Sequence, residues 1–122
     1  MSELRTINDA EELNYGNLID PVSGEGIVPV VCIDTMKLET EGLAAYRMQA
    51  YATRFAMVQT LGTGIATFWS RSRQGLWVKG AESGNFLIVR GAYTDCDADS
   101  VLLDVEAMGP SCHTGANSCF EK

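Results

Sequence analysis

A series of short runs rich in β-branched and aromatic residues recurs along this chain, each bounded by glycine, serine or other turn-forming residues. Such runs are typical of β-strands, because branched and aromatic side chains pack well on a pleated surface. Proline in the first run cannot donate to a strand ladder, so Pro29 is expected at the start of its strand or on an edge. Cys32, in the same run, is expected to be a small buried hydrophobe. The predicted strands are residues 27–33, 65–70, 76–79, 85–90 with a continuation to Asp97, and 101–106.

Residues 43–61, between the first two of these runs, fit two secondary structures. Their Ala, Met, Arg and Gln content favours one long helix. Thr53 is a plausible N-cap, which would leave residues 44–51 either as a strand or as an earlier part of that helix. The helix is predicted to end at residues 62–64 in both cases. Strands with a single intervening helix predict an α+β domain, dominated by antiparallel sheet and containing one principal helix.

The chain has 122 residues, 46% of them hydrophobic, which predicts one globular domain over residues 1–122. Residues 1–25 are polar and acidic, and we expect an N-terminal arm lying over the domain or over a partner subunit, with one or two helical turns at residues 8–14. No apolar run is long enough to span a bilayer and the N-terminus lacks a signal-peptide layout, so a cytoplasmic protein without membrane association is expected. The net charge of −7 argues against a nucleic-acid partner but not against a small phosphorylated ligand.

Three aspartates occupy alternate positions, at Asp95, Asp97 and Asp99. On an extended strand these carboxylates would share one face, with Cys96 on the other. Carboxylates gathered on one face repel each other, and a hard cation such as Mg²⁺ would relieve the repulsion. Successive side chains on that face would lie about 6.5 Å apart, so one ion would need strand bending, bridging waters or ligand phosphates to reach all three. A solvated acidic face is the alternative interpretation.

Three of the four cysteines, Cys96, Cys112 and Cys119, fall in the last thirty residues, and the only histidine, His113, follows Cys112. Thiolates suit Zn²⁺, and three of them leave the fourth tetrahedral position open, as in a catalytic zinc site. His113 could fill that position. Because adjacent side chains in extended backbone diverge, we expect it instead to act near the metal as an acid or base. Buried or free thiols are the alternative.

An otherwise acidic chain concentrates three cations and two serines in residues 70–80. Arg71 and Arg73, if they share a strand face, could clamp an anionic group, and the backbone amides of the following tight loop could complete an anion nest. A solvated strand with charge-balancing arginines is the alternative. The candidate anion-binding residues are Arg71, Arg73, Lys79, Ser83, Gly84 and Asn85.

Taken together and in order, these motifs resemble the phosphoribosyl-AMP cyclohydrolase family of histidine biosynthesis. The resemblance implies an intertwined homodimer that shares zinc between subunits, with Cys96 from one subunit and Cys112 and Cys119 from its partner. It also implies Mg²⁺ at Asp95, Asp97 and Asp99. For residues 43–61 it favours a strand followed by a helix. The match runs from about Pro29 to Phe120 and comprises residues 68–74, 76–77, 79–80, 83–85, 95–99, 109–115 and 118–120.

Resemblance to this family also implies a substrate and a reaction. The family substrate is 1-(5-phosphoribosyl)-AMP, whose N1–C6 bond is hydrolysed to give the formimino-carboxamide ribonucleotide. A zinc-bound water would be the nucleophile, and His113 would move a proton between that water and the departing ring nitrogen. The candidate anion-binding residues, with Mg²⁺, would hold the substrate's phosphates.

The first 25 residues have no clear counterpart in the family, and the chain departs from the family pattern in three further places. Residues 80–85 read Gly-Ala-Glu-Ser-Gly-Asn where Gly-Glu-Thr-Ser-Gly-Asn is usual, residues 50–53 read Ala-Tyr-Ala-Thr where Ala-Tyr-Met-Asn is usual, and there are extra residues around 37–43. Two alternative functions stay open, the first of them motivated by residues 81–82 and 37–43. One is a cyclohydrolase or deaminase acting on another purine nucleotide. The other is a non-catalytic binding module whose zinc only staples a dimer, although such a staple would need neither His113 nor the basic cluster.

Overall fold

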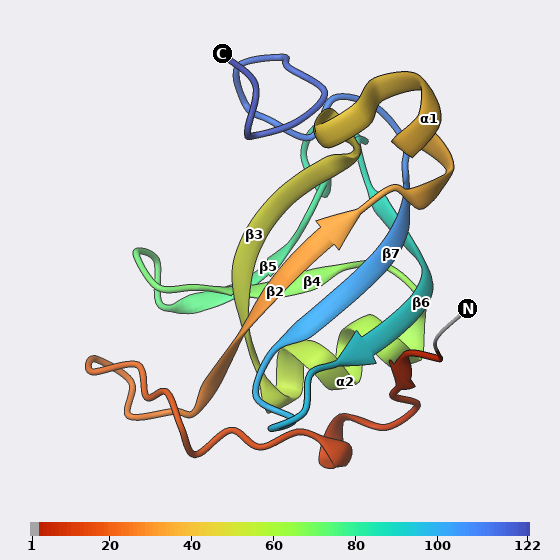
Figure 1. Ribbon diagram of the computed structural model, residues 1–122. Helices are drawn as coiled ribbons and strands as arrows, with labels where there is room; N and C mark the ends of the chain where they lie inside the picture. Colours follow the sequence, from red (N-terminus) through yellow and green to blue (C-terminus); the bar gives the residue numbers. More distant parts are fainter. Residues whose placement is uncertain (1–2) are drawn as a thin grey trace.

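The computed structural model describes residues 3–122, and within this range seven strands form one mixed sheet, accompanied by two α-helices (Figure 1). The α+β class is confirmed, and α2 is the principal helix. The strands are β1 (Arg5–Thr6), β2 (Ile27–Ile33), β3 (Tyr46–Thr53), β4 (Thr67–Ser70), β5 (Gly75–Val78), β6 (Leu87–Thr94) and β7 (Val101–Ala107). The helices are α1 (Leu38–Glu41) and α2 (Arg54–Thr63), with 3-10 turns η1 (Ala10–Glu12), η2 (Thr35–Lys37) and η3 (Gly42–Ala45).

Strand order across the sheet is β1-β6-β7-β2-β3-β4-β5, and the described strands pair antiparallel except for β2 with β7. The expected predominance of antiparallel pairing is therefore confirmed, with one parallel pair. Pro29 pairs with Tyr51 of β3, whereas β7 joins β2 only from Val30 onward. At Pro29, β2 has a neighbour on one side alone among the described strands, so its missing N–H interrupts no ladder with β7.

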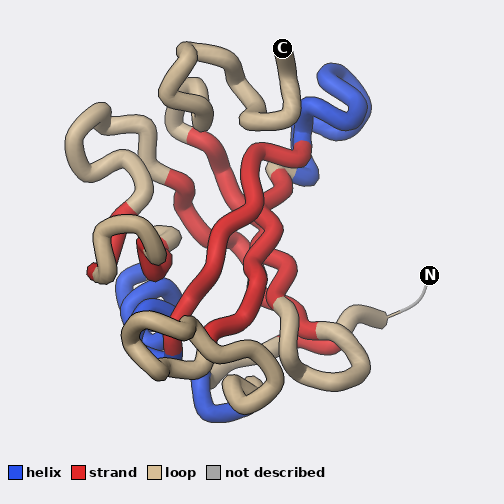
Figure 2. Tube along the Cα trace, turned by 90° about the vertical axis from the view of Figure 1, so that its left-hand side faces the viewer, coloured by secondary structure: helices blue, strands red, loops and turns tan. Residues whose placement is uncertain are grey.

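The core lies where α2 packs against the sheet. Ala56 and Met57 of α2 are fully buried, as are Phe68 of β4 and Cys32 of β2. The expectation for Cys32 is thus confirmed. In Figures 1 and 2, α2 and the α1 region lie at opposite ends of the strands. The principal helix therefore covers one end of the sheet, while the short helix α1, its flanking 3-10 turns and loops lie at the opposite end.

Residues 46–63 form a strand and then a helix, so the long helix favoured by propensity is wrong. β3 pairs with β2 along its length, from Thr53 opposite Ile27 to Tyr46 opposite Ile33. This non-local pairing overrides the local preference for helix. Thr53 caps α2 as predicted, its Oγ1 accepting a 3.2 Å hydrogen bond from the amide of Ala56. The helix also ends as expected, at Gly64 with φ of 76°.

Two segments that we expected to be strands are turns. β6 ends at Thr94, and the aspartates follow it in a turn in which the amide of Asp99 donates to Asp95 Oδ1 at 3.1 Å. Short Asp side chains compete for nearby backbone N–H groups in this way and so favour turns over strands. β4 likewise ends at Ser70, and residues 71–74 turn the chain into β5. Neither the aspartates nor the two arginines share a strand face.

The N-terminal arm packs on its own domain. Ile7, Ala10 and Leu13 belong to the buried core, and Asp9 caps η1 through a capping box with Glu12. The predicted helical turn at residues 8–14 is therefore present as a 3-10 turn. Across residues 3–122, no helix combines the length and the apolar character needed to cross a membrane.

Candidate active site

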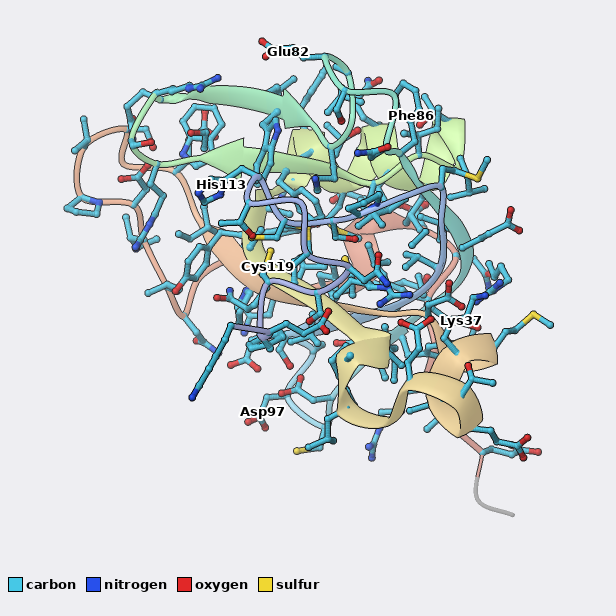
Figure 3. The ribbon with its side chains drawn as sticks, turned by 90° about the horizontal axis from the view of Figure 1, so that it is seen from above. Lys37, Glu82, Phe86, Asp97, His113 and Cys119 are labelled. Atoms are coloured by element: carbon cyan, nitrogen blue, oxygen red, sulfur yellow. The ribbon has the colours of Figure 1, made fainter. Side chains whose placement is uncertain are left out.

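A cleft of about 770 Å³ lies between the β4–β5 hairpin, the loop that follows β5, and the C-terminal segment after β7. Figure 3 shows His113 and Cys119 beside that hairpin. Most of the residues singled out from the sequence meet here, although they come from distant parts of the chain. The predicted site residues that line the cleft are Arg73, Lys79, Ser83, Asn85, Cys112, His113 and Cys119.

The start of the C-terminal segment is fixed by Asp34, which lies at the end of β2 and is buried. Its Oδ2 accepts a 3.2 Å hydrogen bond from the amide of Ala107, the last residue of β7, and its Oδ1 accepts a 2.6 Å bond from Arg90. Burial raises the pKa of Asp34, but the hydrogen bonds from Arg90 and Ala107 and the charge of Arg90 outweigh burial and hold that pKa below its usual value. The carboxylate therefore stays charged and ties the end of β7 to β2.

Backbone hydrogen bonds shape the rest of this segment, which has no regular secondary structure. Ser111 N donates to Asn117 O and Cys112 N donates to Ala116 O, both at 3.1 Å, which closes residues 111–117 into a loop. Ser118 is fully buried, and its hydroxyl donates to a β3 carbonyl oxygen. Ser118 belongs to the family match, but the sequence did not predict this structural role for it. Its position beside Cys119 was the available signal, because Ser in loops commonly bonds to backbone groups.

The two cysteines of the cleft influence each other. Thr114 Oγ1 donates to Cys112 Sγ at 3.1 Å, and this hydrogen bond is the main reason that the pKa of the Cys112 thiol is lowered. Partial desolvation of Cys119, followed by the neighbouring Cys112 charge, raises the pKa of the Cys119 thiol. Lys79 is only 9% exposed, and its positive charge lies close enough to favour the thiolate form of both cysteines. The pair thus offers two adjacent sulfur ligands beside a cation.

The loop after β5 is held against the C-terminal segment. Gly80 has φ of 92°, and a Cβ there would lie 2.5 Å from the backbone of Asn85, so only glycine permits this close turn. A Cβ on Gly109 would lie 2.4 Å from Asn85 Oδ1. Ser83 Oγ accepts a 3.1 Å hydrogen bond from Asn85 N, and this tight loop is as predicted. Gly84 is not among the lining residues of the cleft.

The two arginines of the β4–β5 turn have different surroundings. Arg73 lines the cleft together with Ser70 and Ser72. The guanidinium of Arg71 instead lies 4.5 Å from the ring centroid of Tyr51 on β3, a cation–π contact, and Arg71 does not line the cleft. The expected two-arginine clamp is therefore reduced to Arg73 in this conformation.

Cys96 and the three aspartates lie away from this cleft. They form the turn between β6 and β7, whereas Cys112 and Cys119 follow the other end of β7 (Figure 1). Seven extended residues span about 23 Å, and β7 has seven. Within residues 3–122, no three His, Cys, Asp or Glu side chains come together in a way that could hold a metal ion. One copy of the chain does not bring Cys96 to the other two cysteines.

Comparison with known proteins adds the decisive observation. The family model described as phosphoribosyl-AMP cyclohydrolase matches residues 48–121, which include every lining segment of the cleft and the aspartate turn. The chain belongs to the phosphoribosyl-AMP cyclohydrolase family. This confirms the resemblance noted in the sequence.

Named relatives agree with this family. The chain is 43% identical over 102 residues to a phosphoribosyl-AMP cyclohydrolase of Clostridium botulinum, covering 84% of this chain and 87% of the relative. It is 42% identical over 100 residues to the phosphoribosyl-AMP cyclohydrolase of a Bacillus cereus strain, covering 82% of this chain and 93% of that one. It is also 46% identical over 114 residues to the histidine biosynthesis bifunctional protein HisIE of Deinococcus radiodurans, covering 93% of this chain and 46% of that protein.

The residues of this family member suit the two metals in different ways. Cys112 and Cys119 are adjacent soft ligands, and the hydrogen bond from Thr114 favours the thiolate that zinc requires. In the aspartate turn, a hydrogen bond from Ser100 is the main cause that lowers the pKa of Asp95, so this carboxylate is ionised. Ionised carboxylate oxygens are the ligands that Mg²⁺ prefers. Both donor sets supply the ligand type that the expected metal prefers, but among residues 3–122 neither set brings three such side chains together in one copy.

Proposed function

We propose that this chain is a metal-dependent phosphoribosyl-AMP cyclohydrolase, which hydrolyses the N1–C6 bond of 1-(5-phosphoribosyl)-AMP in histidine biosynthesis. The observation that carries the proposal is the cleft of a family member in which two adjacent cysteines, a histidine and two cations meet. The sulfurs provide a metal site, the histidine an acid or base, and the cations a place for phosphates. A protein that only binds zinc as a structural staple would need the first of these alone.

The substrate's phosphates are assigned to the cations of the cleft. Arg73 presents a planar guanidinium suited to bidentate contact with a phosphate, and Lys79 lies buried in the cleft wall. Ser83 and Asn85 add polar groups from the neighbouring loop. This arrangement would place the purine toward the C-terminal segment, where Cys112, His113 and Cys119 lie.

His113 is assigned the proton transfers. It lines the cleft next to Cys112 and is exposed, so that its imidazole can reach solvent and substrate. In the proposed reaction its ring accepts the proton released when water attacks C6 and delivers it to N1 as the N1–C6 bond breaks. Zinc, when bound by the cysteines, supplies a water of lowered pKa that is nucleophilic near neutral pH.

A homodimer is part of the proposal, because Cys96 lies at the opposite end of β7 from the other cysteines. Cys96 of a second copy would complete the zinc ligands of the first, and the first would do the same for the second. The neighbouring Asp95, Asp97 and Asp99 would arrive with it and bring Mg²⁺ to the substrate's phosphates. In the proposed dimer, the aspartate turn of each copy would therefore join the cleft of the other, although it lies away from the cleft of its own copy.

The test is the ultraviolet absorbance change after 1-(5-phosphoribosyl)-AMP is added to purified protein with Mg²⁺. We expect ring opening that stops when a zinc chelator is added and returns when zinc is restored. AMP and related purine nucleotides, assayed in parallel, are expected to be turned over far more slowly. Faster turnover of any of these would move the assignment to that nucleotide, and no turnover of any nucleotide by zinc-loaded protein would overturn the proposal.

A further inference from the structure

The N-terminal arm contributes one buried carboxylate that the proposed chemistry does not use. Asp20 is 1% exposed, although it lies in a loop outside the sheet. Its Oδ2 accepts two hydrogen bonds of 2.8 Å, one from the indole N–H of Trp69 and one from the side-chain amide of Gln74. Its Oδ1 accepts a 3.1 Å bond from the amide of Val22. A buried, multiply bonded carboxylate between two distant segments is a specific connection rather than a solvated charge.

The backbone around Asp20 is itself anchored. Asp20 N donates to Glu25 O at 2.9 Å, and Gly24 N donates back to Asp20 O at 2.8 Å. Ile27 N, at the first residue of β2, donates to Leu18 O at 2.9 Å. The loop is therefore closed on itself and joined directly to a central strand, so that the Asp20 carboxylate projects from a fixed base.

What Asp20 holds is the turn between β4 and β5. Gln74, the last residue of that turn, has φ of 54°, a conformation that non-glycine residues rarely adopt. Its side-chain amide also donates to the carbonyl oxygen of Arg71 at 2.8 Å, so one amide group links Asp20 to the far side of the turn. At the β4 side of the turn, the hydroxyl of Ser70, the last residue of β4, accepts a 3.3 Å hydrogen bond from the backbone N–H of Arg73. The turn has polar contacts on both sides.

We infer that Asp20 is a positioning residue, which fixes the β4–β5 turn so that Arg73 faces the cleft and meets the phosphates of the nucleotide. The inference rests on the proposed function for the identity of the ligand. Asp20 does not line the cleft, whereas Arg73 does. The negative charge of Asp20 therefore lies outside the proposed phosphate site, while its hydrogen bonds hold the turn that carries Arg73.

The charge state of Asp20 agrees with this role. The hydrogen bond from Gln74 and then that from Trp69 lower the pKa of Asp20 from 3.8 to about 2. The group is an ionised acceptor at neutral pH, and hydrogen bonds to an ionised acceptor are stronger than those between neutral groups. An asparagine of the same shape would place an N–H₂ group or a weaker oxygen opposite the two donors. Asp20→Asn is therefore a sharp test that hardly changes side-chain volume.

The kinetic test compares Asp20→Asn with Glu25→Gln, which neutralises a carboxylate in the same loop whose side chain makes none of these contacts. For Asp20→Asn we expect KM for 1-(5-phosphoribosyl)-AMP to rise about tenfold with kcat nearly unchanged, because a phosphate contact is misplaced and the reacting atoms are not. Trp69→Phe, which removes one of the donors, is expected to raise KM less, and Glu25→Gln not at all. A proportional fall in kcat at constant KM would indicate loss of folded protein and overturn the inference.

A second readout needs no substrate. Arg71 and Arg73 are exposed trypsin sites in the turn, and Lys37 is an exposed trypsin site in η2. Asp20→Asn is expected to speed native-state cleavage after the two arginines several-fold while cleavage after Lys37 keeps its wild-type rate, since only the turn is released. Unchanged cleavage at both arginines, or equal acceleration at all three sites, would overturn the inference whatever the activity. Selective cleavage in a protein whose wild type turns over no nucleotide would support the hold on the turn and contradict the proposed function instead.

Discussion

The backbone N–H of Cys119 donates a 2.8 Å hydrogen bond to the carbonyl oxygen of Arg47 on β3. The next residue back along the segment, Ser118, is bonded to the carbonyl of Tyr46 on the same strand. The last cysteine is therefore placed by the first residues of β3, about seventy positions earlier in the chain. A C-terminal segment without helix or strand obtains a defined position from backbone groups at the start of β3.

Replacement of Cys119 by serine is expected to abolish both zinc binding and turnover, because a hydroxyl is a poor ligand for zinc. Cys32→Ala is the matched control. Burial raises the pKa of Cys32 to about 12, so it remains a thiol, and its loss should leave a small cavity that costs on the order of 1 kcal/mol. Metal analysis of the two purified variants, with activity, distinguishes them. Full zinc content in Cys119→Ser would remove Cys119 from the ligand set.

Subunit mixing tests the shared site. Cys96→Ser and Cys112→Ser are each expected to be inactive alone, whereas a mixed dimer contains one intact set of cysteines if Cys96 is supplied by the partner. Unfolding the two variants together in equal amounts and refolding them should restore about a quarter of wild-type activity, since half of the dimers are mixed and each has one intact site of two. If all three ligands came from one copy, mixing would restore nothing.

His113→Ala is expected to lower kcat by about 10²- to 10⁴-fold, the usual effect of removing a general acid or base. Zinc content and dimer mass should stay at their wild-type values, because the side chain is assigned to proton transfer and not to the metal. Metal analysis and light scattering on the purified variant provide the check. Loss of zinc from this variant would place His113 among the ligands.

Gly109→Ala tests the contact between the C-terminal segment and the loop after β5. The new Cβ would lie 2.4 Å from Asn85 Oδ1, the end of a flexible side chain, so the Asn85 side chain must rotate away, at little cost in stability. We expect a higher KM, because Asn85 lines the cleft. Gly62→Ala, in α2 with nothing near the added Cβ, should instead raise the free energy of unfolding by about 0.5–1 kcal/mol. Denaturant unfolding and kinetics of both variants give the comparison.

The stability of the folded protein at acid pH should show the contribution of the Asp20 carboxylate. A carboxyl group whose pKa falls on folding, here from 3.8 to about 2, stabilises the folded protein fully above the unfolded pKa. That stabilisation is lost as the pH falls from about 4 through about 2. Asp20→Asn is therefore expected to lose less stability than the wild type over this interval, while being less stable above it. Thermal unfolding at a series of pH values measures the difference, and parallel curves would show that Asp20 is not the group responsible.

Much of the fold was predictable because it depends on neighbouring residues. The β-branched runs became β2, β4, β5, β6 and β7, Thr53 capped α2, and Gly64 ended it. The cleft residues were predictable for a similar reason, since cysteines, cations and a single histidine carry chemistry that few other residue types supply. These features depend on residue type and on local spacing, both of which can be read from the sequence.

Other features were decided by contacts between distant segments. Pairing with β2 made residues 46–53 a strand, although their composition favours a helix. The hydrogen bond from the Asp99 amide to the Asp95 side chain made residues 95–99 a turn where a strand was expected. Tertiary contacts also separated the two arginines, placing Arg71 on Tyr51 and Arg73 in the cleft. Spacing along a sequence does not report such pairings, because their free energy comes from groups that only the folded chain brings together.

The cysteines show both sides of this division. The sequence by itself determined which three sulfurs could serve a metal, because thiolate chemistry belongs to the residue. Only the tertiary structure decided that Cys112 and Cys119 meet in one cleft while Cys96 stands a full strand away, at the other end of β7. The physical reason is the stiffness of a paired strand, which holds its two ends apart by its whole length.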